Sequence, residues 1–597
     1  MENIRSSTVN SSNRRIIALV LILTIIILIL CLWFYRPLKA FSCTGNPPAS
    51  EKASNDIFMD NQIIITGPQA SVQAIVSNPQ LKLGLTLLED CDLGYLGERS
   101  APQPATLPTA NQVKEPTNTL FANPALTEDQ RNSLVLRLYQ TDGSRLVEDV
   151  IRDINRIGHG DLEHPQYVYA DPNYLTDPLQ NGSCGNPFSG GGSPFSGGGS
   201  AYAGYYPTPP APALSVNDFL HQWAFLDTTA MPGGIALPAT FGSSSSDKAN
   251  VAVFDTSPWS QTTLNITVSL PDNSTFDLEV TNEVQTTVVV NNPPTYNISD
   301  HGLFVAGLIH AIAPESKLHL IRVLNDDGCG DLMTIATAIH HYISQMSAAR
   351  TQPNLKNVVM NFSLGVHVPD QEYRDRNPDV KWNELDDELA SLKEAIGNAN
   401  DLGAIIVAAA GNDSAGLSAP AEPELPAGYE HVLAVAANND QGQWSCYSNA
   451  GDLSAPGGDG GAGENPDGSP NPCVPRASSW NNPADCSLTK SLAIYECKYG
   501  VISLSRKAGT NSTEYIYWVG TSFASPLVSG LAAQALDHVQ GDREKALCLI
   551  RAGASPRGGP IPLSSAVTVD WGIINVTNSL SLAVKQACEN MPTSTPQ

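Results

Sequence analysis

The chain has 597 residues, of which 42% are hydrophobic, so it is long enough for several domains with ordinary packed cores. Its formal net charge is -26 at pH 7, which argues against a nucleic-acid-binding protein because such proteins present a basic face to phosphate. No period of roughly 20–50 residues repeats along it, which argues against solenoids and propellers.

The N-terminal segment predicts export. Residues 1–15 are polar and contain three arginines, and residues 16–35 then run without a charge and end in aromatic side chains. Such a run can span a bilayer, and its aromatic end suits a membrane interface. We expect a transmembrane signal anchor with residues 1–15 in the cytoplasm, because no clean cleavage site follows. A cleaved signal peptide and a lipid-modified Cys43 are the alternatives, and all three export the remainder.

The cysteines fit the same compartment. Besides Cys31 in the apolar run there are ten, an even number that is compatible with disulfides outside the cell. The sequence does not fix their connectivity, and buried free thiols are the alternative. No Cys-x-x-Cys pair occurs, which argues against a zinc ribbon or a thioredoxin-type site.

Residues 56–175 are predicted to form a small α+β domain. A β-branched run at 63–67 predicts a strand before a short helix, and 134–139 predicts a second strand before a helix with apolar residues at helical spacing. A tyrosine-rich extended segment at 167–174 follows. These segments predict two β-α units and a closing strand.

Residues 176–213 are predicted to be a linker. They contain an imperfect duplication of Gly- and Ser-rich sequence and then a proline-rich run. Gly/Ser runs are flexible and proline runs are stiffer. Because proteolysis concentrates in exposed flexible chain, we expect a maturation cut in this segment.

Residues 214–585 are predicted to be one α/β domain, followed by a tail at 586–597. Continuous apolar strands that alternate with helices are typical of a parallel sheet buried on both faces. The predicted strands lie near 251–254, 318–324, 357–361, 404–410 and 432–436.

Ser522 lies where an aromatic, β-branched run turns into a helix of small and apolar residues. Backbone N–H groups and the positive end of that helix can stabilise negative charge there. Pro526 is expected in the first helical turn, where proline is tolerated. A lone serine at a helix start is more often only an N-cap, so the position by itself does not indicate catalysis.

Three other segments change that interpretation. Asp255 ends an apolar strand, His301 directly precedes an apolar helix, and Asn412 follows a buried strand that ends in Ala410 and Gly411. Each alone could be a turn or cap residue. Together, in this order before Ser522, they resemble the subtilisin-like serine protease (subtilase) family.

The resemblance implies an α/β subtilisin-like three-layer fold with a mainly parallel central sheet. It implies that Ser522 is the nucleophile, that His301 is the general base and acid, and that Asp255 orients the imidazole. It also implies an oxyanion hole made by the Asn412 side chain and the Ser522 backbone N–H.

Two further segments resemble the family's substrate-binding edges. A peptide would add between them as an extended strand, although both are also ordinary strand-loop connections. No acid obviously lines the matched pocket, so we expect an uncharged, fairly large side chain just before the cleaved bond. The residues assigned to substrate binding are Gly328, Cys329, Gly330, Ser363, Leu364, Gly365, Ala410 and Gly411.

The sequence departs from the family pattern near the catalytic positions. Ser257 stands where the family has glycine, and Leu303 stands where it has threonine, which removes a hydroxyl expected near the histidine. Two long excursions, at 264–290 and 457–514, are expected to border the cleft and to affect specificity.

For residues 56–175 the resemblance implies a ferredoxin-like propeptide that assists folding and inhibits the enzyme within the same molecule; an unrelated α+β domain is the alternative. No cofactor is required, and structural calcium is compatible with the family. Asn325–Gly328 is similar to the start of an EF-hand loop but lacks the remaining ligands, so no calcium ligand is assigned.

We therefore predict a serine endopeptidase that acts on proteins or peptides and is self-processed. It would be a single-pass cell-membrane protein with the catalytic domain outside, or secreted after processing. An α/β-hydrolase is disfavoured because Ala524 replaces the second glycine of Gly-x-Ser-x-Gly and the serine comes last. A zinc protease would need His-Glu-x-x-His. The remaining alternative is a catalytically impaired subtilase-like surface protein that binds peptides.

Overall fold

The computed structural model describes most of the predicted domains. The predicted membrane span at 16–35 and the linker beyond residue 177 lie outside the described residues. Among the residues described, none of the helices has both the length and the hydrophobicity needed to cross a bilayer. The described residues are 41–45, 50–52, 58–94, 120, 123, 125–159, 167–177, 214–238, 248–261, 263–284, 287–289, 298–346, 354–366, 389–414, 420–445, 447–458, 463–464, 470–471, 500–507, 512–556 and 571–589.

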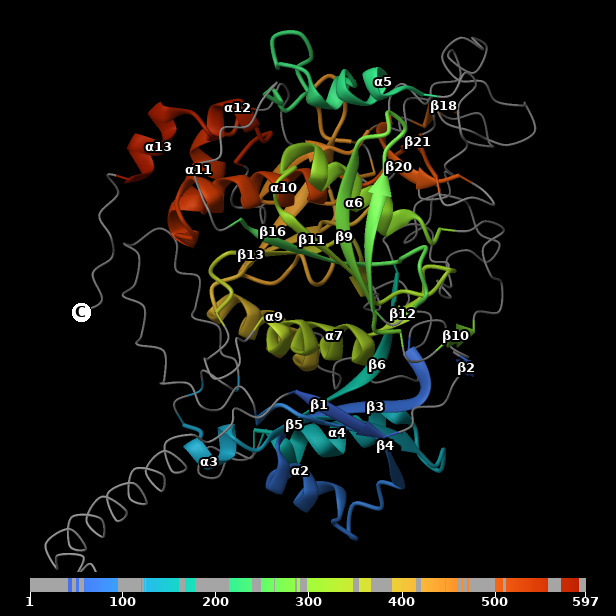
Figure 1. Cartoon of the computed structure of the whole chain (residues 1–597). Coiled ribbons are helices and arrows are strands. Elements are labelled where there is room, and N and C mark those ends of the chain that lie inside the picture. The colour runs from blue at the N-terminus through green and yellow to red at the C-terminus, as the bar shows by residue number, and fades with distance from the viewer. Residues whose placement is uncertain are drawn as a thin grey trace, which may run out of the picture.

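The centre of the molecule is a sheet with the strand order β17-β16-β15-β13-β7-β11-β9-β8 (Figure 1). Neighbouring strands are parallel except for β8, which is antiparallel to β9. The parallel strands predicted from apolar runs are confirmed. The bounds are β7 (Asn250–Asp255), β8 (Thr263–Ser269), β9 (Thr275–Asn282), β11 (Lys317–Arg322), β13 (Val358–Phe362), β15 (Ile405–Ala409), β16 (Val432–Asn438) and β17 (Leu453–Pro456).

The excursion at 264–290 adds strands to the central sheet. Its strands β8 and β9 extend the central sheet beyond β11. In β9 the side chains of Phe276, Leu278 and Val280 are buried, while the residues between them are exposed. That alternation is typical of a strand with one face on the core and one in water, which is why this segment joins the sheet edge.

Helices cover both faces of the sheet. Helices α6 (His301–Ile312) and α10 (Thr521–His538) lie on one face, and α7 (Leu332–Gln345) and α9 (Ala390–Asp401) lie on the other (Figure 1). Side chains alternate along a strand, so Val251 and Val253 of β7 pack into the α6–α10 core, whereas Phe254 packs into the α7–α9 core. The result is a three-layer α/β domain.

The N-terminal unit is an antiparallel sheet in the order β1-β4-β5-β3-β6. From β3 onward, and apart from the four-residue helix α3 between β4 and β5, its elements follow the order β-α-β-β-α-β, which is the ferredoxin-like arrangement. Helix α4 buries Val150, Ile151 and Ile154 on one face, as its spacing predicts. The bounds are β1 (Ser42–Gly45), β3 (Phe58–Pro68), α2 (Gln69–Val76), β4 (Leu85–Asp92), β5 (Leu134–Thr141), α4 (Val147–Gly158) and β6 (Tyr169–Asp177).

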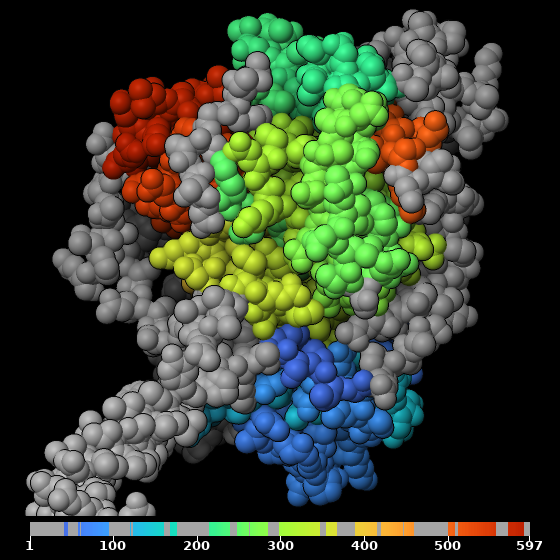
Figure 2. Space-filling view, viewed as in Figure 1, coloured from blue at the N-terminus to red at the C-terminus, as the bar shows by residue number. Residues whose placement is uncertain are grey.

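This unit forms a lobe against the α7–α9 side of the large domain (Figure 2). Two side chains of β6 accept backbone N–H groups at helix starts. Asp171 accepts from Ala390 at 3.2 Å and from Ser391 at 2.9 Å at α9, and Asn173 accepts from Met333 at 3.0 Å at α7. The first N–H groups of a helix lack intrahelical partners, so these contacts are helix caps supplied by the N-terminal unit.

The described cysteines confirm the expectation of disulfides. Cys43 is bonded to Cys91, Cys548 is bonded to Cys588, and Cys329 is also in a disulfide. The alternative of a lipid on Cys43 is wrong for this structure, because one sulfur cannot carry both bonds.

The remaining elements are short strands and helices, together with the hairpin β20–β21 and the C-terminal helices α11 and α13. Their bounds are β2 (Ser50–Lys52), α3 (Glu128–Arg131), α5 (Val216–Leu220), η3 (Trp223–Phe225), β10 (Thr287–Val289), β12 (Gly330–Asp331), β14 (Gly365–Val366), β18 (Gly463–Glu464), β19 (Pro470–Asn471), β20 (Val501–Arg506), β21 (Thr513–Trp518), α11 (Arg543–Gly553), α12 (Val576–Ser579) and α13 (Leu582–Glu589).

Candidate active site

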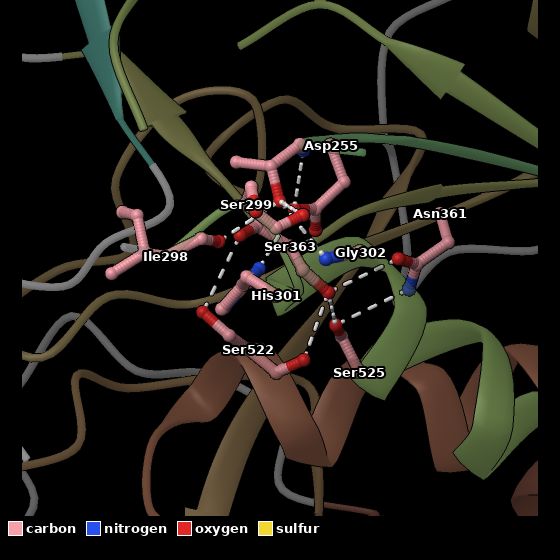
Figure 3. Close-up of polar contacts among 10 residues, drawn as sticks. Asp255, Ile298, Ser299, His301, Gly302, Asn361, Ser363, Ser522 and Ser525 are labelled. Carbon is pink, nitrogen blue, oxygen red and sulfur yellow. Dashed lines mark hydrogen bonds and ion pairs between the residues drawn. The ribbon is translucent and has the colours of Figure 1, made fainter. Parts of the chain in front are cut away.

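Asp255 and His301 are in direct contact (Figure 3). Asp255 ends β7, His301 begins α6, and both side chains are completely buried. Asp255 Oδ1 lies 2.7 Å from His301 Nδ1 and accepts the Thr256 N–H at 2.6 Å. An ionised carboxylate can only accept, so Nδ1 carries the proton and the lone pair of the neutral ring is on Nε2.

The chain around Thr256 holds these two elements together. The Thr256 hydroxyl lies 3.2 Å from the Ile298 carbonyl and 3.0 Å from the Ser299 carbonyl, and it accepts the Gly302 N–H at 3.1 Å. A Cβ on Gly302 would lie 2.2 Å from the Thr256 carbonyl oxygen. Only glycine therefore lets the start of α6 approach the end of β7 this closely.

Aromatic rings enclose the imidazole. The His301 ring centroid lies 5.3 Å from that of Trp518, edge-on, and 5.2 Å from that of Phe523. Within the described part of the chain, the buried Nε2 of His301 makes no hydrogen bond. The lone pair of the imidazole is thus held in a largely apolar environment next to the segment that carries Ser522.

Ser522 lies at the start of α10, which begins at Thr521. Its side chain is completely buried, and its hydroxyl donates to the Ser363 carbonyl at 3.3 Å. The structure therefore brings Ser522 beside the predicted substrate edge, with the hydroxyl bonded to Ser363 in this conformation.

Pro526 is not in the first helical turn, as the sequence suggested, but is the sixth residue of α10. A residue there would normally donate its N–H to the Ser522 carbonyl, four positions earlier, and proline has none. The Ser363 hydroxyl lies 2.8 Å from the Ser522 carbonyl and supplies the missing hydrogen bond. A residue distant in the sequence thus stabilises the turn that presents Ser522.

A buried polar network continues below Ser522 (Figure 3). Asn361 Nδ2 donates to Ser525 Oγ at 3.2 Å, and the Ser363 hydroxyl lies 3.0 Å from Asn361 Oδ1. Asn361 Nδ2 also donates to Ser529 Oγ at 3.0 Å. The sequence analysis missed Ser525 and Ser529. Their spacing of three and then four residues from Ser522, which places all three on one helix face, was the available signal.

Asn412 is oriented by Thr521, the residue before Ser522. Its Oδ1 accepts both the backbone N–H and the hydroxyl of Thr521, each at 3.0 Å. Because an N–H can only donate, the amide oxygen must face Thr521, and the nitrogen is directed away from it. Gly411 has φ +111°, and a Cβ there would lie 2.4 Å from the Asn449 side chain, so glycine is required at this bend.

The two predicted substrate edges lie on either side of one strand. The end of β6 is antiparallel to β12 on one side, with Thr176 opposite Gly330, and to β14 on the other, with Asp177 opposite Gly365. Ser363, which precedes β14, links the second of these edges to Ser522.

The other predicted substrate residues have mainly internal contacts. Cys329 and Leu364 are completely buried, and Gly328 makes a turn with φ +77°. The Ala410 N–H donates to the Val435 carbonyl at 3.0 Å, and its carbonyl accepts from Glu424 at 2.9 Å. These backbone hydrogen bonds of Ala410 fix the end of the strand that leads to Asn412.

The loop at Asn325 does not fit a calcium cage. Asn325 Oδ1 accepts the N–H groups of Asp327 and Cys329, each at 2.9 Å, and Asp326 pairs with Arg322 at 2.8 Å. These oxygens are thus used within the fold. Within the described ranges, the one group of potential metal ligands whose atoms lie together is Cys43, Glu89 and Cys91, and both of its sulfurs form a disulfide.

The departures from the family pattern have structural roles. Leu303 packs in the α6–α10 core, and Ser257 Oγ accepts the Trp259 N–H at 3.2 Å. Strand β20, in the second excursion at 457–514, is hydrogen-bonded to the start of α6. Ser505 Oγ donates to Asp300 at 2.7 Å, and Ser503 Oγ donates to the Phe304 carbonyl at 2.7 Å. Residues 472–499 of that excursion lie outside the described part of the chain.

A buried Asp–His pair at the end of a parallel sheet, next to a serine at a helix start, is the arrangement expected of a serine hydrolase. Residues 246–552, just over half of the chain, match the model of the subtilase family. The chain belongs to the subtilase family of serine proteases.

Curated relatives support this assignment over shorter stretches. The minor extracellular protease Epr of Bacillus subtilis is 30% identical over 26% of this chain and 21% of its own length. Subtilisin Savinase of Lederbergia lenta is 29% identical over 28% of this chain and 55% of its own. The major intracellular serine protease of B. subtilis is 31% identical over 26% of this chain and 44% of its own. The chain thus matches less than two thirds of each relative.

Solved structures match longer stretches of the chain, but their sequence identities are lower and their TM-scores are below 0.5. The epidermin leader peptide processing serine protease of Staphylococcus aureus has 19% identity and a TM-score of 0.41, covering 77% of this chain and 92% of its own. Fervidolysin of Fervidobacterium pennivorans has 15% identity and a TM-score of 0.44, covering 91% of this chain and 64% of its own. At these scores the likeness carries no functional argument.

Proposed function

We propose that this subtilase is a serine endopeptidase that hydrolyses peptide bonds in proteins or peptides. Ser522 would be the nucleophile, His301 the general base and acid, and Asp255 the group that orients the imidazole. The observation that carries the proposal is the buried 2.7 Å hydrogen bond between His301 and Asp255, next to the start of α10. The proposed chemistry requires no cofactor.

The orientation of the His301 ring suits this role. With Nδ1 donating to Asp255, Nε2 would take the proton of the Ser522 hydroxyl as Oγ attacks the substrate carbonyl carbon. The same proton would pass to the leaving amine as the C–N bond breaks, and water would then hydrolyse the acyl-enzyme. Because the hydroxyl contacts Ser363 in the present conformation, a rotation about the Cα–Cβ bond of Ser522 must come first.

The developing negative charge would be stabilised by two donors. One is the Asn412 side-chain nitrogen, which is directed away from Thr521 because the amide oxygen is held there. The other is the Ser522 N–H in the first turn of α10, where N–H groups lack intrahelical partners. Donors that are already oriented before the reaction stabilise the oxyanion without a further reorganisation cost.

We extend the proposal to the N-terminal unit, residues 56–175, as a propeptide that inhibits the enzyme within the same molecule. The support is the place of β6, whose end lies between β12 and β14, where a substrate strand would add. Ser522 is completely buried in this arrangement. Access to the site would require this strand to leave, and a maturation cut in the linker at 176–213 would allow that.

We also propose export, either as a single-pass cell-membrane protein with the catalytic domain outside or as a form secreted after processing. The disulfides Cys43–Cys91 and Cys548–Cys588 support an oxidising compartment, where such bonds persist.

The alternative is a catalytically impaired subtilase-like protein that binds peptides. The observation that favours it is the Ser522 hydroxyl, which contacts the Ser363 carbonyl, while Nε2 of His301 has no hydrogen bond within the described residues. A permanently misdirected hydroxyl would leave the substrate edges intact but remove the nucleophile.

Labelling with a serine-directed phosphonate separates the two. We expect the processed full-length chain to take up one label at Ser522, and the Ser522→Ala chain to take up none. Ser274→Ala, which changes an exposed serine in the β8–β9 turn, is the matched control and should label like the parent. A processed chain that stays unlabelled and leaves casein intact would favour the peptide-binding alternative.

A further inference from the structure

The disulfide between Cys43 and Cys91 joins the edge strand of the N-terminal unit to the rest of its sheet. Strand β1 is four residues long and pairs with β4, with Cys43 directly opposite Cys91. The two cysteines differ in access, because Cys43 is partly buried and Cys91 is completely buried. A thiolate from outside would therefore attack the sulfur of Cys43, and the sulfur of Cys91 would be the leaving group.

Glu89 lies beside this leaving group. A thiolate released in a buried site is costly, because burial disfavours the charge and raises the pKa of a thiol. One carboxyl oxygen of Glu89 lies 3.8 Å from the Cys91 sulfur, and ligand atoms of Glu89 and of both cysteines lie within 4.8 Å of one another. Burial raises the pKa of Glu89 to about 7, so this carboxyl holds a proton in weakly acidic solution. A proton donor thus stands next to the sulfur that must accept a proton.

The charged groups around Glu89 favour its protonated form. Across the contact between the two units, Asp331 and Glu283 line the same small cavity as Glu89, and both are acids. On the neighbouring strand β5, Arg137 donates to Asp90 at 2.8 and 2.9 Å. Side chains alternate along a strand, so Asp90 points away from the face that carries Glu89. The arginine charge is therefore directed to the opposite face of the sheet.

We propose that Cys43, Cys91 and Glu89 form a thiol–disulfide exchange site that an external dithiol opens. One thiolate of the dithiol bonds to the Cys43 sulfur, the Cys43–Cys91 bond breaks, and the Cys91 sulfur leaves with the electron pair and takes the proton of Glu89. The second thiolate displaces Cys43 from the mixed disulfide. Cys43 and Glu89 then take two protons from water, in place of the two that the dithiol released. The protein gains two electrons, and the dithiol leaves as its own disulfide.

Opening this bond would also loosen a contact between the two units. Phe41, two residues before Cys43, donates its N–H to Ser344 of α7 at 3.2 Å, and its ring centroid lies 5.9 Å from that of His340. In the closed state the disulfide ties this contact with α7 to β4. In the open state noncovalent contacts alone join β1 to β4. The exchange site would thus control how firmly the N-terminal unit is held on the large domain.

The relative opening rates of two disulfides test the exchange site. Cys548–Cys588 is the matched comparison, because it too joins a partly buried cysteine to a buried one. The full-length Ser522→Ala chain is treated with dithiothreitol, alkylated at intervals and mapped by mass spectrometry. Both bonds meet the same reductant, so the ratio of the two rates cancels the pH dependence of its thiolate.

We expect this ratio to favour Cys43–Cys91 by about 10-fold or more at pH 5.5, since a positioned proton donor accelerates a reaction by at least that much. The ratio should then fall as pH rises through about 7, where Glu89 has lost the proton that it would donate. A parent ratio that does not change between pH 5 and 8 would overturn the proposal.

Glu89→Gln removes the proton donor and conserves the size of the side chain. It should slow the opening of Cys43–Cys91 about 10-fold or more at pH 5.5, abolish the pH dependence of the ratio, and leave Cys548–Cys588 at the parent rate. Glu128→Gln, at an exposed site in the same unit, is the control and should keep the parent profile. A Glu89→Gln chain that keeps that profile would exclude Glu89 as the donor. The parent profile decides the matter if Glu89→Gln does not fold.

Hydrogen exchange in the same samples tests the effect on the contact between the units. Samples are compared in which Cys43–Cys91 is open while Cys548–Cys588 and the disulfide of Cys329 are intact. We expect the amides of α7 to exchange about 10-fold faster than in the closed chain, and those of α10 to be unchanged. Unchanged exchange in α7 would refute the effect on the contact. Because Ser522 is replaced throughout, these results do not depend on the proposed protease activity.

Discussion

Glu89 gives a pH-dependent prediction that can be worked out from the structure. It lies on β4 of the N-terminal unit with 5% of its surface exposed. Together with Leu138 it lines a small cavity whose other wall includes Glu283 and Asp331 of the large domain. Burial, and then the nearby charge of Asp331, raise the pKa of Glu89 from 4.5 to about 7.

The sign follows from which state holds the proton. Below pH 4.5 Glu89 is protonated in both the folded and the unfolded chain, so its ionisation does not change the free energy of unfolding. Between pH 4.5 and 7 the unfolded chain ionises first, and the free energy of unfolding falls as pH rises. The loss levels off above pH 7 at about 3 kcal/mol, since each pKa unit is worth about 1.4 kcal/mol.

Glu89→Gln removes this dependence because glutamine cannot ionise. In a Ser522→Ala background, which prevents self-cleavage, we expect the variant to match its parent near pH 4 and to melt several degrees higher at pH 8, by thermal unfolding. Glu128→Gln, at an exposed site in the same unit, is the matched control and should follow the parent at every pH. Melting curves of Glu89→Gln and parent that stay parallel from pH 4 to 8 would refute the reasoning.

Because Glu283 and Asp331 belong to the large domain, ionising Glu89 also opposes the contact between the two units. His341 donates to Glu283 at 2.7 Å, and this hydrogen bond raises the pKa of His341. Burial likewise raises the pKa of Asp331. Rising pH therefore adds negative charge at the interface, which favours release of the N-terminal unit.

Two further predictions concern catalysis and stability. Asn412→Ala should lower kcat roughly 10²–10³-fold with little change in KM, which is the range known for loss of the side-chain oxyanion donor in subtilisin itself. Steady-state kinetics on the processed chain test this prediction. An unchanged kcat would exclude Asn412 from the oxyanion hole. Replacing Cys548 and Cys588 by serine should lower the free energy of unfolding by roughly 2–4 kcal/mol, because the bond closes a 40-residue separation in the unfolded chain. Denaturant titration measures it, and an unmoved midpoint would show that the bond adds no stability.

Much of the fold could be predicted because its signals are local. The parallel strands are continuous apolar runs, and β7 ends at Asp255 where the sequence indicated. Strand β9 was harder to place, because its alternating pattern indicates a half-buried strand without saying which strand it pairs with. Its neighbours proved to be β11 and β8. Pairing depends on the shape of the whole sheet and not on the strand's own residues.

The sequence by itself determined the order of Asp255, His301, Asn412 and Ser522 and the elements that carry them, since each is marked by a local change from apolar run to turn. Only the tertiary structure showed that Ser363 supplies the hydrogen bond that Pro526 cannot, and that β6 lies between β12 and β14. These contacts join residues more than 150 positions apart, and no local pattern encodes such a separation. Their geometry follows from packing, because the end of β6 reaches both edges while the N-terminal unit lies against α7 and α9.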